Sequence, residues 1–407
     1  MKSEIILSQT IIPAISKAQV NLLVKLHPER FKQQAKNPVD LRFVLDRSGS
    51  MDDRCADGNT KLEVLKKSLE ELIDILKPNQ DSIYIAAFDD NVLEVVPKQI
   101  VKNRNELKQK VNALVSGGST KMSDALDLGI MAKKMDVHNV LTKIIIFTDG
   151  QVNVGNVAAE ERRCHQLADE GRKRGISFSV FATGIDYNEM FLRKIAEFGG
   201  GGSYFMHVGQ VGQVRAQLQD EIDLLRSIED QNIEVEFIAE DGVILSDVLK
   251  TIPQQLDLKV DQKKAVKDSF PGLDIRGQSY LMKLEVPPAP EGDFQLGVIK
   301  LAWIDTAGRK LTDDLRVVVQ RTGDEAQVSK LNPTVLKTVY NSAAVRATTM
   351  NNIDLATKLF KTAGNDKMVT QLETLGTATK TGNEEAGRTL RTIVTTSAHK
   401  DDDSETD

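Results

Sequence analysis

The sequence predicts an α/β protein: a doubly wound, mainly parallel sheet, inserted in or followed by an antiparallel β-sandwich, with a helical C-terminal segment. Three observations predict this fold. Between Pro97 and Pro253 there is no proline, and short apolar runs alternate with amphipathic segments, as in βαβ units. After residue 232 the apolar period becomes two, which is typical of antiparallel strands. From Pro333 the period is helical again, and 407 residues are enough for two or three domains.

The α/β domain is predicted over residues 38–228. Continuous apolar runs predict its strands at 41–45, 83–88, 143–147, 177–183 and 203–208. Apolar residues spaced by three and four predict its helices at 61–76, 105–115, 122–135, 157–174, 189–198 and 213–228. Strands without polar interruption indicate a sheet that is covered on both faces.

The β-sandwich is predicted over residues 229–325. Apolar and alternating runs predict strands at 233–237, 256–260, 280–286, 295–304 and 315–320. Turn signals separate these runs at 240–242, 271–272, 287–290 and 307–308. Residues 19–26 are also strand-like, so we expect the N-terminal segment 1–37 to join the sandwich. The α/β domain would then be an insertion whose two ends lie close together.

Residues 330–398 are predicted to be helical, because their apolar side chains fall on helical faces. Residues 399–407 form an acidic tail that is too charged to pack, so we expect it to be disordered.

Composition narrows the class of function. The formal charge of −6 comes from 53 basic and 59 acidic residues, and five of the acids lie in 401–407. The rest of the chain is nearly neutral, which argues against nucleic-acid binding. Cys55 and Cys164 are too few for a disulfide framework: a single bridge between them is one alternative, and two free thiols in a reducing compartment is the simpler interpretation. No apolar run approaches the ~20 residues of a membrane span, and the N-terminus is a poor signal peptide, so we expect a cytoplasmic protein.

Oxygen-bearing side chains gather in three loops of the α/β domain. In an open α/β sheet, ligands bind at the carboxyl ends of the strands. Asp46, Ser48 and Ser50 follow the first strand, Asp149 follows the strand at 143–147, and Thr120 ends a Gly-Gly loop. Two carboxylates and three hydroxyls suit Mg²⁺, and also Mn²⁺ or Ca²⁺, rather than zinc or copper.

This pattern resembles the von Willebrand factor type A (VWA) domain with a metal-ion-dependent adhesion site. The Asp-x-Ser-Gly-Ser motif stands at Asp46–Ser50, and Thr120 and Asp149 match the family's second and third elements. The resemblance covers about half of the chain. It implies that these five residues bind a divalent cation, directly or through water, and that a partner's Asp or Glu carboxylate completes the coordination.

The order of the domains is similar to that of bacterial VWA proteins of the Ca-activated-chloride-channel-like or inter-α-trypsin-inhibitor-like group. This weaker resemblance rests on the arrangement of the β region and the helical C-terminus. The family also implies a class of partner, a MoxR-type AAA+ ATPase or a signalling assembly.

A long loop over residues 52–60 overhangs the predicted site. Asp52, Asp53 or Asp57 would add ligands or shape the choice of partner in a functional interpretation. In the simpler interpretation the loop is solvated, and Asn59 or Thr60 caps the following helix.

The main functional hypothesis is a non-enzymatic module that captures a partner carboxylate through the cation, as an adaptor or assembly factor. A divalent ion would offset the cost of burying that carboxylate. One alternative is a metal-dependent hydrolase, in which the ion polarises a phosphoryl or carbonyl group. The other is a structural scaffold whose binding needs no metal. The acidic tail at 401–407 is a candidate to plug the site of its own or a neighbouring molecule.

Overall fold

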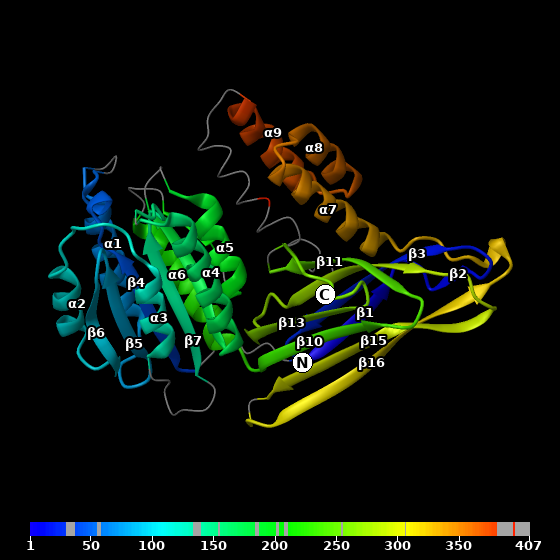
Figure 1. Ribbon diagram of the computed structural model, residues 1–407, viewed down its shortest axis with the longest axis horizontal. Helices are drawn as coiled ribbons and strands as arrows, with labels where there is room; N and C mark the ends of the chain where they lie inside the picture. Colours follow the sequence, from blue (N-terminus) through cyan, green and yellow to red (C-terminus); the bar gives the residue numbers. More distant parts are fainter. Residues whose placement is uncertain are drawn as a thin grey trace.

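The computed structural model describes residues 1–29, 37–54, 58–132, 140–153, 155–183, 187–200, 203–206, 211–253, 255–305, 307–380 and 394. Figure 1 shows an α/β domain, an antiparallel β-sandwich beside it, and three helices that lie over the sandwich. The predicted fold class is confirmed: a largely parallel sheet with helices, an antiparallel sandwich and C-terminal helices.

The α/β domain is built on a six-stranded sheet with the order β6-β5-β4-β7-β8-β9. Its strands are β4 (Val39–Asp46), β5 (Ser82–Phe88), β6 (Val92–Ile100), β7 (Leu141–Thr148), β8 (Ile176–Thr183) and β9 (Ser203–Met206). All neighbours are parallel except β5 and β6. Strand β6 is not among the predicted strands. It lies at the edge, is mostly exposed and contains Pro97, so its apolar signal is weak.

Helices cover both faces of this sheet, as the continuous apolar strands predict. They are α1 (Lys61–Ile75), α2 (Arg104–Asn112), α3 (Ser123–Met131), α4 (Val157–Lys173), α5 (Glu189–Gly199) and α6 (Val211–Ser227). One core joins α1, α2 and α6 to one face, and a second joins α3, α4 and α5 to the other. Cys164 in α4 is a free, buried thiol, as expected, and Cys55 lies outside the described residues.

The sandwich contains two five-stranded sheets, β1-β3-β14-β11-β12 and β13-β10-β15-β16-β2. Its strands are β1 (Lys2–Leu7), β2 (Ile11–Pro13), β3 (Ala18–His27), β10 (Gln231–Ala239), β11 (Ile244–Ile252), β12 (Leu256–Asp257), β13 (Ala265–Gly272), β14 (Gln278–Val286), β15 (Gly292–Ile304) and β16 (Lys310–Thr322). Strand β3 pairs with β14, so the N-terminal segment lies within the sandwich. Asn37 Nδ2 donates a hydrogen bond of 3.0 Å to the Ile228 carbonyl, which brings the two ends of the α/β domain together.

Two local predictions in the sandwich are wrong. The expected turn at 271–272 lies inside β13, where Gly272 pairs with Gln231. Strand β13 is an edge strand and tolerates Pro271, which has no backbone N–H to donate. The expected strand at 256–260 is only the two-residue β12.

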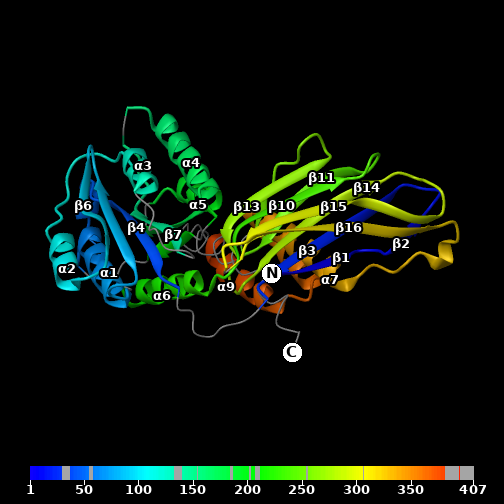
Figure 2. The same cartoon turned by 90° about the horizontal axis from the view of Figure 1, so that it is seen from below.

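The C-terminal helices are α7 (Pro333–Thr349), α8 (Ile353–Thr362) and α9 (Asp366–Lys380). Asn332 caps α7, and Pro333 occupies its first turn. Figures 1 and 2 both show α7 beside the sandwich, and Val335 packs there with Leu23 of β3 and Leu281 of β14. Most of the predicted helical stretch after residue 380, and the acidic tail, lie outside the described residues.

An ionic junction connects the α/β domain to the sandwich. Arg172, near the end of α4, places Nη1 3.0 Å from Asp268 Oδ1 in β13. Asp268 is buried, and it also contacts Lys250 Nζ at 3.3 Å and accepts a hydrogen bond of 3.0 Å from the Tyr280 hydroxyl. Burial acts to raise the pKa of Asp268, but Lys250, Arg172 and Tyr280 outweigh it and lower the pKa, so Asp268 is held as a carboxylate.

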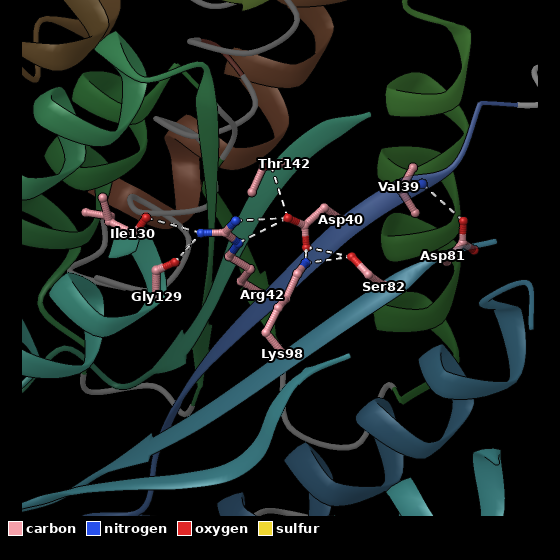
Figure 3. Close-up of polar contacts among 9 residues, drawn as sticks. All are labelled: Val39, Asp40, Arg42, Asp81, Ser82, Lys98, Gly129, Ile130 and Thr142. Carbon is pink, nitrogen blue, oxygen red and sulfur yellow. Dashed lines mark hydrogen bonds and ion pairs between the residues drawn. The ribbon is translucent and has the colours of Figure 1, made fainter. Parts of the chain in front are cut away.

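A buried charge network holds together the strand ends opposite the predicted site (Figure 3). Asp40, near the start of β4, contacts Arg42 at 2.9 Å, accepts a hydrogen bond from Ser82 at 2.9 Å and forms an ion pair with Lys98. The Arg42 guanidinium also donates to the Gly129 carbonyl at 2.6 Å, near the C-terminus of α3. A cation at this end of a helix satisfies carbonyls that have no intrahelical partner.

Candidate metal centre

The five predicted ligand residues come from three loops at one edge of the six-stranded sheet. Asp46 is the last residue of β4, and Asp149 follows β7 directly. Ser48 and Ser50 flank the start of a short 3-10 helix, Gly49–Asp52, and Thr120 lies in the loop between α2 and α3. Because β4 and β7 are parallel neighbours, their carboxyl ends meet at this edge.

Backbone contacts hold the three loops together. The Gly49 N–H donates to the Gly118 carbonyl at 3.1 Å, and the Gly117 N–H donates to the Arg47 carbonyl at 2.8 Å. Thr120 forms an isolated β-bridge with Asn153, beyond Asp149. These bonds connect the Asp46 loop to the Thr120 loop, and the Thr120 loop to the Asp149 loop.

Two glycines allow this close approach. Gly118 has φ +70°, and a Cβ there would lie 2.6 Å from Asp90 Oδ2. Gly150 has φ +67°, and a Cβ there would lie 2.7 Å from Leu192 Cγ. Both glycines are therefore required by backbone conformation and by space.

Asp46 is a fully buried carboxylate that receives hydrogen bonds but no cation. Its Oδ1 accepts from the Ser48 N–H at 2.8 Å, and its Oδ2 accepts from the Thr148 hydroxyl at 2.6 Å. No Lys or Arg forms an ion pair with Asp46 in the described part of the chain. Burial is the main cause that raises the pKa of Asp46 to about 6, against the hydrogen bonds from Ser48 and Thr148, which lower it.

Asp149 is equally buried, but it has a cationic neighbour. Its Oδ1 accepts from the Gln151 N–H at 3.1 Å, and its Oδ2 lies 3.2 Å from Lys61 Nζ. Lys61 Nζ also lies 3.3 Å from Asp53 Oδ2. Burial acts to lower the pKa of Lys61, but the two carboxylates outweigh burial and raise it, so Lys61 carries a positive charge.

Ser48 and Ser50 share the loop of Asp46, and the third hydroxyl, that of Thr120, lies in the separate loop between α2 and α3. Ser48 Oγ and Ser50 Oγ are 3.2 Å apart, and Ser48 and Thr120 are both only 2% exposed. The Thr120 hydroxyl makes no hydrogen bond to any residue that the structure describes. A buried hydroxyl without a protein partner is free to bind an ion or its water.

The donor set fits a hard divalent cation. All donors are oxygens, and the Asp46 carboxylate is desolvated without a charge to balance it. Within the described ranges, no group of three or more His, Cys, Asp or Glu side chains is placed to hold a metal. Cation binding at this edge would therefore depend on the hydroxyls as well as on the two carboxylates. The metal role of all five residues stays a prediction.

The overhanging loop is partly described. Asp52 ends the 3-10 helix, Asp53 is largely exposed and contacts Lys61, and Asp57 lies outside the described residues. Thr60 and Glu63 form a reciprocal capping box at the start of α1, so the expected cap is confirmed at Thr60. The role of Asp52, Asp53 and Asp57 as further ligands stays a prediction.

Two residues of the site were missed by reasoning from the sequence. Lys61 was assigned only to a helix, and its contact with Asp149, 88 residues away in sequence, has no local signal. Thr148 lies next to Asp149 and has no predicted role, although its hydroxyl donates a hydrogen bond to Asp46. The Gly150 N–H donates to Thr148 Oγ1 at 2.9 Å, which leaves the hydroxyl proton for Asp46.

Comparison with known proteins agrees with the fold of the α/β domain. The von Willebrand factor type A domain model matches residues 40–221. The uncharacterized protein sll0103 of Synechocystis sp. is 24% identical over 290 residues. That match covers 70% of this chain and 66% of the relative, so about a third of the relative lies outside it.

Two solved structures resemble nearly the whole chain. A von Willebrand factor type A protein from Catenulispora acidiphila has a TM-score of 0.76 at 18% identity and covers 97% of this chain and 96% of its own. The ArnB paralog VWA2 from Sulfolobus acidocaldarius has a TM-score of 0.67 at 16% identity and covers 98% of each chain. These similarities show the fold, and the narrower likeness to the chloride-channel-like and inhibitor-like group stays a prediction. Residues 40–221 of this chain therefore match the von Willebrand factor type A domain model and have its fold.

Proposed function

We propose that this protein is a protein-interaction module that captures an Asp or Glu carboxylate of a partner through a divalent cation. The cation would be held by Asp46, Ser48, Ser50, Thr120 and Asp149, and Mg²⁺ is the first choice because all donors are hard oxygens. VWA domains are generally interaction modules rather than enzymes.

One observation carries this proposal. Asp46 is fully buried at a loop edge and has no cationic partner among the described residues, and the buried Thr120 hydroxyl has no hydrogen-bond partner among them either. A buried carboxylate in this state is unfavourable, and a divalent cation would relieve it. Two protein carboxylates also leave the ion able to accept a third, anionic ligand from outside.

The partner is defined here by its chemistry, an acidic side chain that reaches the sheet edge. A MoxR-type ATPase or a signalling assembly is the class that the family resemblance implies. No helix of the described chain has the length and apolar character needed to cross a membrane. A cytoplasmic location is part of this proposal.

The test is calorimetric titration of Mg²⁺ and Mn²⁺ into the wild type and into Ser48→Ala/Asp149→Ala. We expect saturable binding in the wild type and none in the double variant, with the fold retained by circular dichroism. The matched control is Asp241→Asn/Ser246→Ala, which removes a carboxylate and a hydroxyl at exposed positions of the sandwich. Equal binding by all three proteins would place the cation elsewhere.

Acetate can stand in for the partner carboxylate. If the cation keeps a position for an anionic ligand, acetate should tighten Mn²⁺ binding by the wild type and leave any weak binding by the double variant unchanged. Turnover of a phosphate or ester substrate that disappears in Asp46→Ala would instead favour the hydrolase. Partner binding that survives EDTA would favour the scaffold.

A further inference from the structure

A lysine side chain reaches into the candidate metal centre from α1. Lys61 Nζ lies 3.2 Å from Asp149 Oδ2, and the Lys61 side chain is only 9% exposed. Lys61 is the first residue of α1, and its N–H donates to the Asp53 carbonyl at 3.1 Å, so its backbone is fixed beside the site.

The ammonium group occupies one particular oxygen of Asp149. The other oxygen, Oδ1, already accepts a hydrogen bond from the Gln151 N–H. Lys61 therefore uses the carboxylate oxygen that the local backbone leaves open, which is the oxygen most available to a metal or a metal-bound water. Asp46 receives no such ion pair in the described chain, so only one of the two buried carboxylates, Asp149, has a cationic neighbour there.

We propose that Lys61 is an intramolecular counter-ion that competes with the divalent cation for Asp149. An ammonium group and a divalent ion at the same carboxylate oxygen repel each other, so binding of the ion displaces Lys61 Nζ. Asp53 Oδ2, 3.3 Å from Nζ and on a side chain that is 68% exposed, offers the displaced ammonium a second partner. Lys61 thereby sets the concentration of cation at which the site fills. This inference rests on the proposed function.

A role for Lys61 in orienting Asp149 would change the cation affinity in the opposite direction. If Lys61 only orients Asp149 for the cation, its removal would weaken cation binding. If it competes, its removal would strengthen binding. The sign of the change in affinity therefore separates the two roles.

The decisive variant is Lys61→Met, which keeps the aliphatic stem and removes the charge. The matched control is Lys66→Met on the same helix, because in the described part of the chain Lys66 Nζ contacts the Asn112 carbonyl, at 3.0 Å, and no carboxylate. In calorimetry with Mn²⁺ at fixed pH and ionic strength, Lys61→Met should bind about tenfold more tightly than the wild type. Lys66→Met should stay within about twofold of the wild type, since an exposed charge acts weakly. Equal or weaker binding by Lys61→Met overturns the proposal.

The same titration separates this inference from the proposed function. If the wild type binds Mn²⁺, Ser48→Ala/Asp149→Ala does not, and Lys61→Met binds no more tightly, only the competition by Lys61 is wrong. If neither the wild type nor Lys61→Met binds, both proposals are wrong. Binding by Lys61→Met alone supports both.

A second measurement uses the wild type and does not depend on a variant that folds. Lys61 and Lys66 are acetylated with an amine-reactive reagent in EDTA and in Mg²⁺, and each site is quantified by mass spectrometry. Displacement from Asp149 should make acetylation of Lys61 several-fold faster in Mg²⁺, while Lys66 is unchanged. An unchanged rate at Lys61 overturns the proposal.

Discussion

Asp46 is deeply buried and is also one of the predicted metal ligands. Metal binding requires its ionised form, but in the metal-free protein burial makes that form unfavourable. Its carboxylate accepts hydrogen bonds from the Ser48 N–H and the Thr148 hydroxyl. Burial nevertheless raises its pKa from 3.8 to about 6, so ionised Asp46 destabilises the fold.

We expect Asp46→Asn to stabilise the protein in EDTA and to abolish cation binding. The amide keeps an acceptor for the Ser48 N–H and removes the buried charge. A pKa rise from 3.8 to about 6 corresponds to at most roughly 3 kcal/mol of unfolding free energy at pH 7.5. Chemical denaturation measures the first effect and calorimetry the second. A variant less stable than the wild type in EDTA would contradict this account.

The same residue predicts a dependence on pH. Between pH 3.8 and about 6 the native state holds a proton on Asp46 that the unfolded state has lost, so this contribution to stability falls as pH rises. The stability advantage of Asp46→Asn over the wild type should therefore grow from pH 4 to about 6 and then level off. The wild type should also bind Mg²⁺ up to about tenfold more weakly per pH unit below about 6, because the cation needs the ionised form. A flat difference across this range would show that Asp46 titrates normally.

At the scale of the elements, β4 carries a buried carboxylate near each end, and the two carboxylates differ in whether they are ion-paired. Asp46 stands at the carboxyl end and has no ion pair in the described chain. Asp40, near the other end, is satisfied by Arg42, Lys98, Ser82 and Thr142 (Figure 3). Such a satisfied network fixes the registry of neighbouring strands and does not indicate a binding site.

We expect Asp40→Asn to lower the unfolding free energy by about 3–5 kcal/mol, because the buried Arg42 and the partly buried Lys98 lose their counter-ion. Urea denaturation measures the loss. Asp74→Asn is the control, since Asp74 is exposed and pairs with Lys108, and it should change stability by less than about 1 kcal/mol. Six residues of strand separate Asp40 from Asp46 by about 20 Å. The folded Asp40→Asn variant should therefore bind Mn²⁺ like the wild type.

At the scale of the whole molecule, Arg172 provides the described ionic contact between α4 and the sandwich. Asp268 would keep Lys250 and Tyr280 as partners without it. Loss of Arg172 should therefore loosen the junction and leave the sandwich intact.

We expect Arg172→Leu to weaken amide protection in the last turn of α4 and in β13 by about 10- to 100-fold, as the loss of a charged hydrogen bond predicts. Hydrogen exchange followed by mass spectrometry checks this. The control is Arg163→Leu on the same helix, where the arginine is exposed and pairs with Glu170. Equal exchange in both variants and the wild type would show that apolar packing alone holds the junction.

The strands that were predicted correctly are those with an unmistakable local signal. Strands β4 and β7 are buried along their whole length and read as continuous apolar runs. Strand β6 is mostly exposed, and β13 contains Pro271, so both depend on pairing with a neighbour rather than on their own pattern. The candidate ligands Asp46, Ser48, Ser50 and Asp149 could be picked out because they follow β4 and β7 directly, and Thr120 because it follows a Gly-Gly pair.

Apolar periodicity and short motifs were therefore sufficient for the fold class, for the buried strands and most helices of the α/β domain, and for naming the five candidate ligands. Local residues encode these features through propensity, burial and backbone conformation. The sequence alone did not reveal the pairing of Lys61 with Asp149, the hydrogen bond from Thr148 to Asp46 or the junction at Asp268. Each of these depends on packing between segments 88 to 102 residues apart, and such contacts form only when the sheets and helices assemble.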